Sequence, residues 1–143
     1  MNWRIKMNLT CALWFSVLLA FSPAQTQQSP EQLARQAAGS WLILVDAGKY
    51  ADSWQEASSF FKSHVSKEQW RSMLHASRDP FGKLTLRKFK SASYTKTLPG
   101  APDGEYVVIQ YESSFENKQS SAETITPMLD KDGRWRISGY YIK

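Results

Sequence analysis

The first half of the chain carries apolar residues about every four positions, the spacing that one face of an α-helix requires. One stripe runs from Leu33 to Val45 and a second from Tyr50 to Val65, and a third consists of Trp70, Met73 and Leu74. The segment Ser66–Gln69 matches a capping box and opens the third stripe. The pattern predicts three helices, each placing one tryptophan in the core: Trp41, Trp54 and Trp70. The alternative is that one of these tryptophans stacks on a ligand.

The second half carries apolar residues at every second position, which is typical of strands with one buried face. The alternation predicts four strands, which begin near Leu84, Val107, Ala122 and Trp135. Three helices followed by four tightly linked strands favour an antiparallel meander over a parallel sheet. The expected fold class is therefore α+β, with three N-terminal helices packed on a four-stranded antiparallel meander sheet.

Side-chain parity along each strand predicts which residues face the helices. The first strand places Leu86 and Tyr94 on one face, and Phe89, which breaks the alternation, indicates a β-bulge. In the last strand, Ile137 and Tyr141 share the side that we expect to be buried.

The first two dozen residues have the composition of a secretory signal peptide. Arg4 and Lys6 precede an apolar run over Leu9–Phe21, which is shorter than the roughly 20 residues of a membrane-spanning helix. We expect cleavage between Ala24 and Gln25, no stable membrane anchor afterwards, and a protein outside the cytoplasm. The expected organisation is a signal peptide over 1–24, a flexible lead over 25–32 and a single α+β domain over 33–143.

Charge and cysteine content narrow the function classes. The formal net charge is +5, and loss of the leader leaves 16 basic and 13 acidic residues. Because these charges are scattered rather than gathered on a dense basic face, we expect no nucleic-acid partner. The only cysteine, Cys11, lies in the leader. The expected mature protein therefore has no disulfide, thiolate nucleophile or cysteine-bound metal.

The sequence contains no motif for a metal or a cofactor. His64 and His75 lie on different predicted helices, without an H-x-H or HExxH pattern. The loop at residues 100–104 lacks the Lys-Ser/Thr pair and the following helix of a phosphate-binding loop. No G-x-S-x-G nucleophile motif is present either. We expect no cofactor and no metal; a two-histidine site completed by a carboxylate is the alternative.

Glu123 is the most suggestive charged residue. Strand parity places it on the face of Ile125 and Leu129, toward the helices. A carboxylate at the open end of a half-buried sheet is a candidate general base, because desolvation raises a carboxyl pKa. Arg87 is its candidate partner if the bulge at Phe89 turns it inward. Alternatively, Glu123 lies at a strand end, either solvated or in a structural ion pair.

Tyrosines form the second candidate set, and five of them lie in predicted strands: Tyr94, Tyr106, Tyr111, Tyr140 and Tyr141. Tyr94, Tyr111 and Tyr141, together with Arg87, are the candidates for lining the mouth of a pocket. Their rings would contact an apolar ligand and their hydroxyls would orient it. The alternative is ordinary sheet surface and core, because aromatic residues favour strands.

Three segments carry a family resemblance: WLILVDAGKYADSW (41–54), LPGAPDGEYVVIQYESSF (98–115) and AETITPMLDKDGRWRISGYYI (122–142). They resemble the bacterial family catalogued as domain of unknown function 4019, whose members look like exported proteins. The resemblance covers the chain from about Leu33 to its end, and it implies a periplasmic or secreted location. The order of helices before a curved sheet is also similar to cystatin-like and nuclear transport factor 2-like rolls.

These observations favour an exported envelope protein that binds without catalysis. Its expected partner is an unknown small ligand or another envelope protein. The alternative is an acid–base enzyme of isomerase or dehydratase type that uses Glu123. A chaperone-like or structural envelope factor is a third interpretation, which differs from the first only in its partner.

Overall fold

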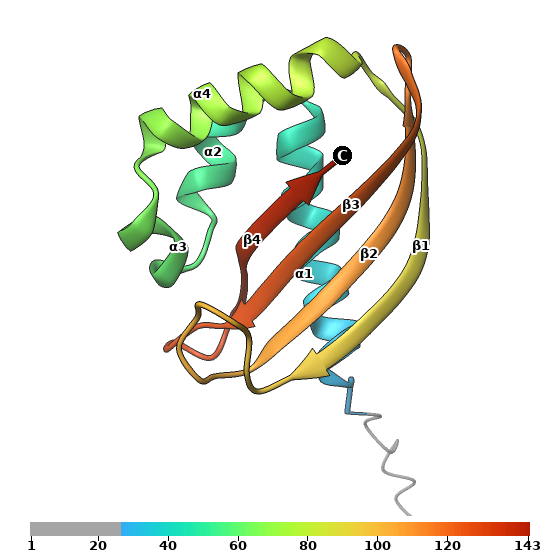
Figure 1. The fold of residues 1–143 in the computed structure, drawn as a ribbon. Helices are drawn as coiled ribbons and strands as arrows, with labels where there is room; N and C mark the ends of the chain where they lie inside the picture. Colours follow the sequence, from blue (N-terminus) through green and yellow to red (C-terminus); the bar gives the residue numbers. More distant parts are fainter. Residues whose placement is uncertain (1–26) are drawn as a thin grey trace, which may run out of the picture.

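The computed structural model describes residues 27–143, in which helices cover one face of a curved four-stranded sheet (Figure 1). The helices are α1 (Pro30–Asp46), α2 (Tyr50–Gln55), α3 (Ser59–His64) and α4 (Lys67–Arg78), followed by the 3-10 helix η1 (Asp79–Phe81). The strands are β1 (Leu84–Thr95), β2 (Tyr106–Phe115), β3 (Lys118–Leu129) and β4 (Trp135–Ile142). Neighbouring strands pair in chain order, which confirms the α+β class with an antiparallel meander. The signal peptide predicted over residues 1–24 lies outside the described residues.

α1 begins where the sequence supplies its cap. The Ser29 side chain accepts from the Gln32 amide and the Gln32 side chain accepts from the Ser29 amide, which completes a capping box. Residues 30–32, within the segment assigned to the lead, are therefore helical. One face of α1 is buried against the inside of the curved sheet (Figure 1). The buried residues on that face are Ala34, Ala38, Trp41, Leu42 and Val45.

The second predicted helix is divided in two. α2 ends at Gln55, and α3 begins after Ser58, whose side chain accepts a hydrogen bond from the Phe61 amide. The Ser58 amide donates to the carbonyl of Ile137 in β4, at 2.9 Å. The prediction of one helix over Tyr50–Val65 is wrong, because this contact with the sheet takes the Ser58 amide out of the helical hydrogen-bond series.

α4 begins at the predicted capping box, with Ser66 and Gln69 exchanging side-chain hydrogen bonds with each other's amides. Trp70 and Leu74 are buried as expected. Met73, which was expected on the same apolar side, is 56% exposed. The buried face of α4 is therefore narrower than the sequence pattern predicts.

A bulge in β1 decides which of its side chains face the helices. The register of β1 against β2 shifts between Phe89 and Ser91, which confirms the predicted irregularity. Before the bulge Arg87 reaches the end of α1, whereas Leu86 is 52% exposed. The prediction that Leu86 shares a face with Tyr94 is wrong, because the bulge reverses the parity between them.

A second bulge acts in the same way in β4. The pairing of β3 with β4 skips Ser138 and thereby reverses the parity of the residues that follow. Tyr140 turns inward, with its ring 5.4 Å from that of Trp41, whereas Tyr141 is 62% exposed. The prediction that Tyr141 shares the buried face of Ile137 is wrong.

The core lies between the sheet and the helices, and two tryptophans anchor it. Trp41 and Trp70 are buried, and Trp54 is half-buried against the same cluster. The indole of Trp41 donates to the Ser53 carbonyl at 2.8 Å, and that of Trp70 donates to the Ser53 hydroxyl at 3.0 Å. Because both indole N–H groups have partners, the two rings stabilise the core without a buried unpaired donor.

Candidate functional site

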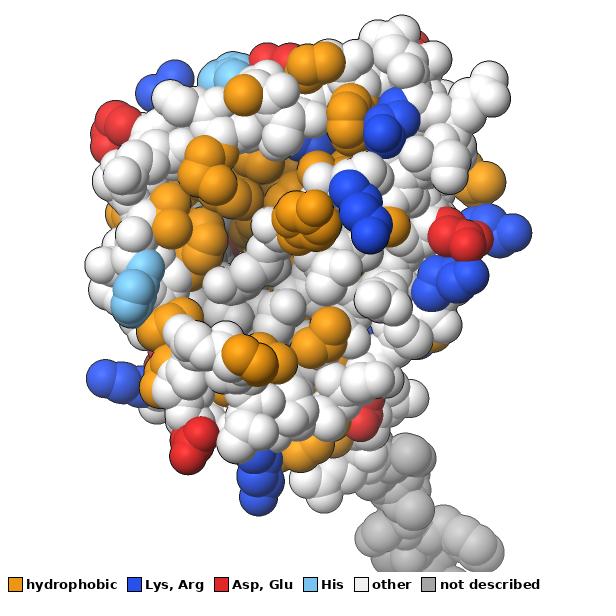
Figure 2. Space-filling view, viewed as in Figure 1, with side chains coloured by type: hydrophobic (Ala, Val, Ile, Leu, Met, Phe, Trp, Pro, Cys, Tyr) orange, Lys and Arg blue, Asp and Glu red, His pale blue; other side chains and the backbone are white. Residues whose placement is uncertain are grey.

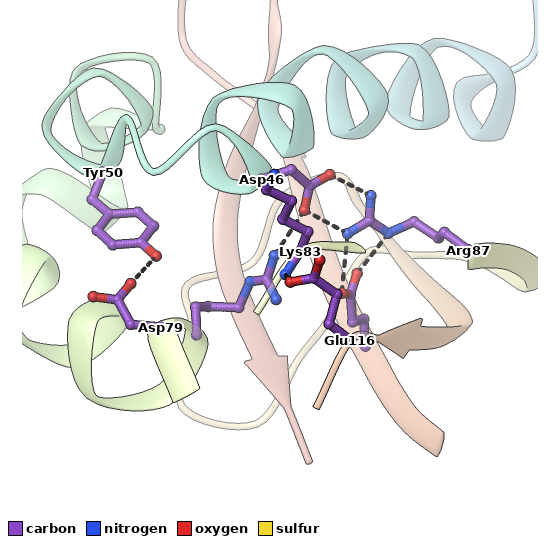
Figure 3. Close-up of polar contacts among 8 residues, drawn as sticks. Asp46, Tyr50, Asp79, Lys83, Arg87 and Glu116 are labelled. Carbon is purple, nitrogen blue, oxygen red and sulfur yellow. Dashed lines mark hydrogen bonds and ion pairs between the residues drawn. The ribbon is translucent and has the colours of Figure 1, made fainter. Parts of the chain in front are cut away.

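Four charged side chains from four different elements meet at one end of the sheet (Figure 3). Arg87 on β1 donates from Nε and Nη2 to both oxygens of Glu123 on β3, at 2.9 and 3.0 Å. Its Nη1 and Nη2 also donate to both oxygens of Asp46, at 2.7 and 3.0 Å. Arg78, the last residue of α4, donates to Asp46 at 2.9 Å. We call these four residues the charge network.

The charge network is electrically balanced and mostly closed to solvent. The exposed fractions of the side chains are 0% for Glu123, 4% for Arg78, 13% for Arg87 and 21% for Asp46. Burial alone would lower the pKa of Arg87, but its hydrogen bonds to Asp46 and Glu123 outweigh burial and raise the pKa above its ordinary value. Each Glu123 oxygen accepts a hydrogen bond from the permanently charged guanidinium of Arg87.

Polar atoms beside the charge network add hydrogen-bond donors to the interior. Within the described part of the chain, the hydroxyls of Ser113, Ser121 and Tyr140 are buried without a hydrogen-bond partner. Burial raises the pKa of Tyr140, and the negative charge of Glu123 adds to the effect. Two nitrogens of Arg78 are likewise unpartnered, but its guanidinium lies 4.2 Å from the centre of the Phe115 ring in a cation–π contact.

The contact between Arg87 and Glu123 is the one that strand parity suggested. The sequence does not predict Asp46 and Arg78, because both lie at helix ends, where the spacing of apolar residues does not indicate which polar side chains point inward. One signal existed for Asp46, since a carboxylate at the C-terminal end of a helix is disfavoured by the helix dipole unless a cation lies beside it.

The predicted tyrosines do not converge on one site. Tyr94 is half-buried, and its hydroxyl donates a hydrogen bond to Glu105 at 2.9 Å. Burial is the main cause that raises the pKa of Tyr94, and the hydrogen bond to Glu105 adds to it. Tyr111 is half-buried with its pKa raised by burial, and its ring meets Phe89 edge-on at 6.2 Å. Tyr141 lies on the outer face of the sheet. These positions do not support a shared pocket mouth.

A smaller polar chain links α2 to the end of α4. The Tyr50 hydroxyl donates to Asp79 Oδ1 at 2.6 Å, and His75 Nδ1 lies 2.7 Å from Asp79 Oδ2. Burial and the hydrogen bond to Asp79 raise the pKa of Tyr50 to about 12. His64, the other histidine, lies on α3. Among the described residues, no group of three or more His, Cys, Asp or Glu side chains is placed to hold a metal ion.

Two adjoining concavities lie between α1 and the start of β4, with volumes of about 560 and 470 Å³. We call the pair the α1–β4 groove. Both concavities are lined by Ala37, Ser40, Arg134 and Trp135. The larger one adds Leu33, Glu105 and Leu129, among others, and the smaller one adds Trp41, Leu44, Glu56, Arg136 and Ile137. The periodicity of the sequence does not predict this groove, because its walls combine exposed, half-buried and buried positions that lie far apart in the chain.

A second apolar surface lies elsewhere on the molecule. Hydrophobic side chains gather between α3, α4 and β4, while most charged side chains on that face lie toward its rim (Figure 2). A depression of about 570 Å³ between α3 and α4 includes Val65 and Met73. Its remaining lining is polar, and no arginine or lysine borders it. The described helices include none that is both long and apolar enough to cross a membrane.

Comparison with known proteins gives a family but no activity. Residues 37–140 match the family model described as "Protein of unknown function (DUF4019)". The matched segment begins within α1 and reaches Tyr140 in β4. It therefore contains the whole charge network and most of the α1–β4 groove. No curated protein matches the chain.

Proposed function

This chain belongs to the DUF4019 family, whose function is not known, and we propose that it is an exported, non-catalytic module that binds an apolar ligand in the α1–β4 groove. The observation that carries the proposal is the pair of concavities, whose volumes fall within the range of about 300–1,000 Å³ typical of small-molecule sites. The smaller concavity has an apolar wall of Trp41, Leu44, Trp135 and Ile137, which an apolar ligand would contact. The larger concavity includes the polar residues Gln27, Gln28 and Gln36 in its lining.

The state of Glu123 supports binding over acid–base catalysis. Its side chain has no exposed surface, and Arg87 occupies both of its oxygens. A substrate would have to displace a buried ion pair before the carboxylate became available, and this displacement costs several kcal/mol. The groove lies outside the charge network and needs no such rearrangement.

Both edges of the sheet argue against a partner that binds by adding a strand. The β1 edge carries Lys88 and Lys90 and is interrupted by the bulge near Phe89. On β4, the carbonyl of Ile137 already accepts the amide of Ser58. Strand addition requires a continuous row of free backbone groups, so we favour a ligand that lies in the groove.

We expect the neutral fluorescent probe N-phenyl-1-naphthylamine to bind the protein saturably, with a rise in emission as it enters the apolar groove. Ser40 lies on the wall shared by both concavities, and its side chain is exposed. Ser40→Trp would fill this junction and should weaken binding about tenfold, the change that about 1.4 kcal/mol produces.

The matched control is Ala76→Trp, which adds the same ring at an exposed position of α4. Its dissociation constant should stay close to that of the unaltered protein. Saturable binding that both variants leave unchanged would place the probe elsewhere and contradict the groove. Absence of saturable binding would contradict the proposed function itself.

Export is the second part of the proposal, and it depends on the basic start, the apolar run Leu9–Phe21 and the small residues that follow. We expect the protein recovered from its natural host to lie in the periplasmic or extracellular fraction and to begin at Gln25. Intact-mass spectrometry of each fraction would measure this. A cytoplasmic protein that retains the leader would contradict export without bearing on the groove.

A further inference from the structure

The charged side chains that line the α1–β4 groove differ in whether they have a hydrogen-bond or ion-pair partner. Four of them border it: Glu56, Glu105, Arg134 and Arg136. Glu105 accepts a hydrogen bond from Tyr94 at 2.9 Å. Arg136 donates from Nη1 and Nη2 to the two oxygens of Asp132, at 2.6 and 2.7 Å. The hydrogen bonds to Asp132 raise the pKa of Arg136, and the negative charge of Glu56 adds to the effect.

Arg134 differs from Arg136, the other arginine of the groove. Its backbone amide donates to Asp132 at 3.2 Å, but its guanidinium makes no ion pair or hydrogen bond with the described residues. It lines both concavities and therefore lies at their junction, with Trp135 beside it. A guanidinium presents a planar fork of N–H donors that matches a carboxylate, and it is weakly hydrated for a cation.

We propose that the ligand of the groove is an amphipathic carboxylate, whose head group pairs with Arg134 and whose hydrocarbon chain lies on the apolar lining. This inference rests on the proposed function. The chain would follow Ala37, Leu44 and Trp135 into the smaller concavity, whose inner wall is apolar. Glu105 borders the larger concavity and Glu56 the smaller one. Their negative charges repel a carboxylate at the outer end of either concavity, and therefore favour its position beside Arg134 on the wall that the two concavities share.

The test compares decanoate with 1-decanol, which share a hydrocarbon chain and differ in the charge of the head group. Isothermal titration calorimetry should give a dissociation constant about tenfold lower for decanoate, because a charge-assisted hydrogen bond adds about 1.4 kcal/mol. Arg134→Gln should abolish the difference and leave decanol binding unchanged. Added sodium chloride should weaken only the binding of decanoate.

Arg71→Gln is the matched control, because Arg71 is exposed on α4 and borders neither concavity. This variant should keep the preference for decanoate. Equal affinities for the two compounds, or a preference that survives in Arg134→Gln, would overturn the assignment of the carboxylate and leave the apolar groove standing. Failure of both compounds to bind would overturn the proposed function together with this inference. Circular dichroism would verify that each variant is folded.

Discussion

Replacing Glu123 with glutamine is expected to lower the free energy of unfolding by about 3–5 kcal/mol, the usual loss when one partner of a buried ion pair is removed. Glutamine keeps the shape of the side chain but removes its charge. Arg87 then faces only Asp46, which it shares with Arg78. The interior is left with two positive charges and one negative charge. Urea titration would measure the loss as a lower transition midpoint at unchanged slope.

Two further variants test whether the loss of stability comes from an unpaired buried charge or only from a lost ion pair. Glu112→Gln removes an ion pair with Lys90 on neighbouring strands, but both of those side chains are more than half exposed. It should cost less than about 1 kcal/mol. The double variant Arg87→Met, Glu123→Leu should recover most of the stability, because no unpaired charge remains and Asp46 keeps Arg78. Equal losses for Glu123→Gln and Glu112→Gln would mean that Glu123 is solvated at a strand end.

Replacing Trp70 with alanine is expected to lower the free energy of unfolding by about 3–5 kcal/mol, the range for truncating a buried large aromatic residue. The Trp70 side chain is 2% exposed. Its ring lies 5.1 Å from that of Phe61 and 5.9 Å from that of Trp41. Its indole also donates to the Ser53 hydroxyl, so the substitution leaves both a cavity and an unpaired hydroxyl.

Met73→Ala provides the control within the same helix. Met73 was expected beside Trp70 on the buried side, but it is 56% exposed. Its truncation should change the free energy of unfolding by less than about 0.5 kcal/mol. Thermal unfolding of both variants, followed by circular dichroism, would measure the contrast. A decrease in the unfolding midpoint of Met73→Ala as large as that of Trp70→Ala would mean that Met73 is buried, as the sequence pattern predicts.

The order of the elements could be predicted because it depends on local signals. The change from a period near four to a period of two marks the start of the sheet, and the capping box at Ser66 marks the start of α4. The break between α2 and α3 could not be predicted in this way. It depends on the amide of Ser58 meeting the carbonyl of Ile137, which lies far along the chain.

The charge network could be predicted only in part, and the reason is the same. Parity suggested Arg87 and Glu123, but the inward turn of Arg87 depended on a bulge whose exact position is set by pairing with β2. No residue pattern signals the bulge at Ser138, so strand parity predicts Tyr141 on the face that Tyr140 occupies. Local sequence predicts that side chains alternate between the two faces of a strand, whereas the pairing of strands determines which side chains face the core.

The charge network has a further consequence for how the chain selects its fold. Arg87 lies opposite Ser113, and Ser113 lies opposite Ser121, so two short side chains leave room for the guanidinium to reach Glu123 across β2. If β1 were displaced by one residue so that Leu86 took the place of Arg87, Asp46 would keep Arg78, but Glu123 would lose its cation. Burying Glu123 unpaired would cost several kcal/mol. Misassembled sheets are therefore penalised by charge as well as by packing, and only one alignment of the four elements closes the network.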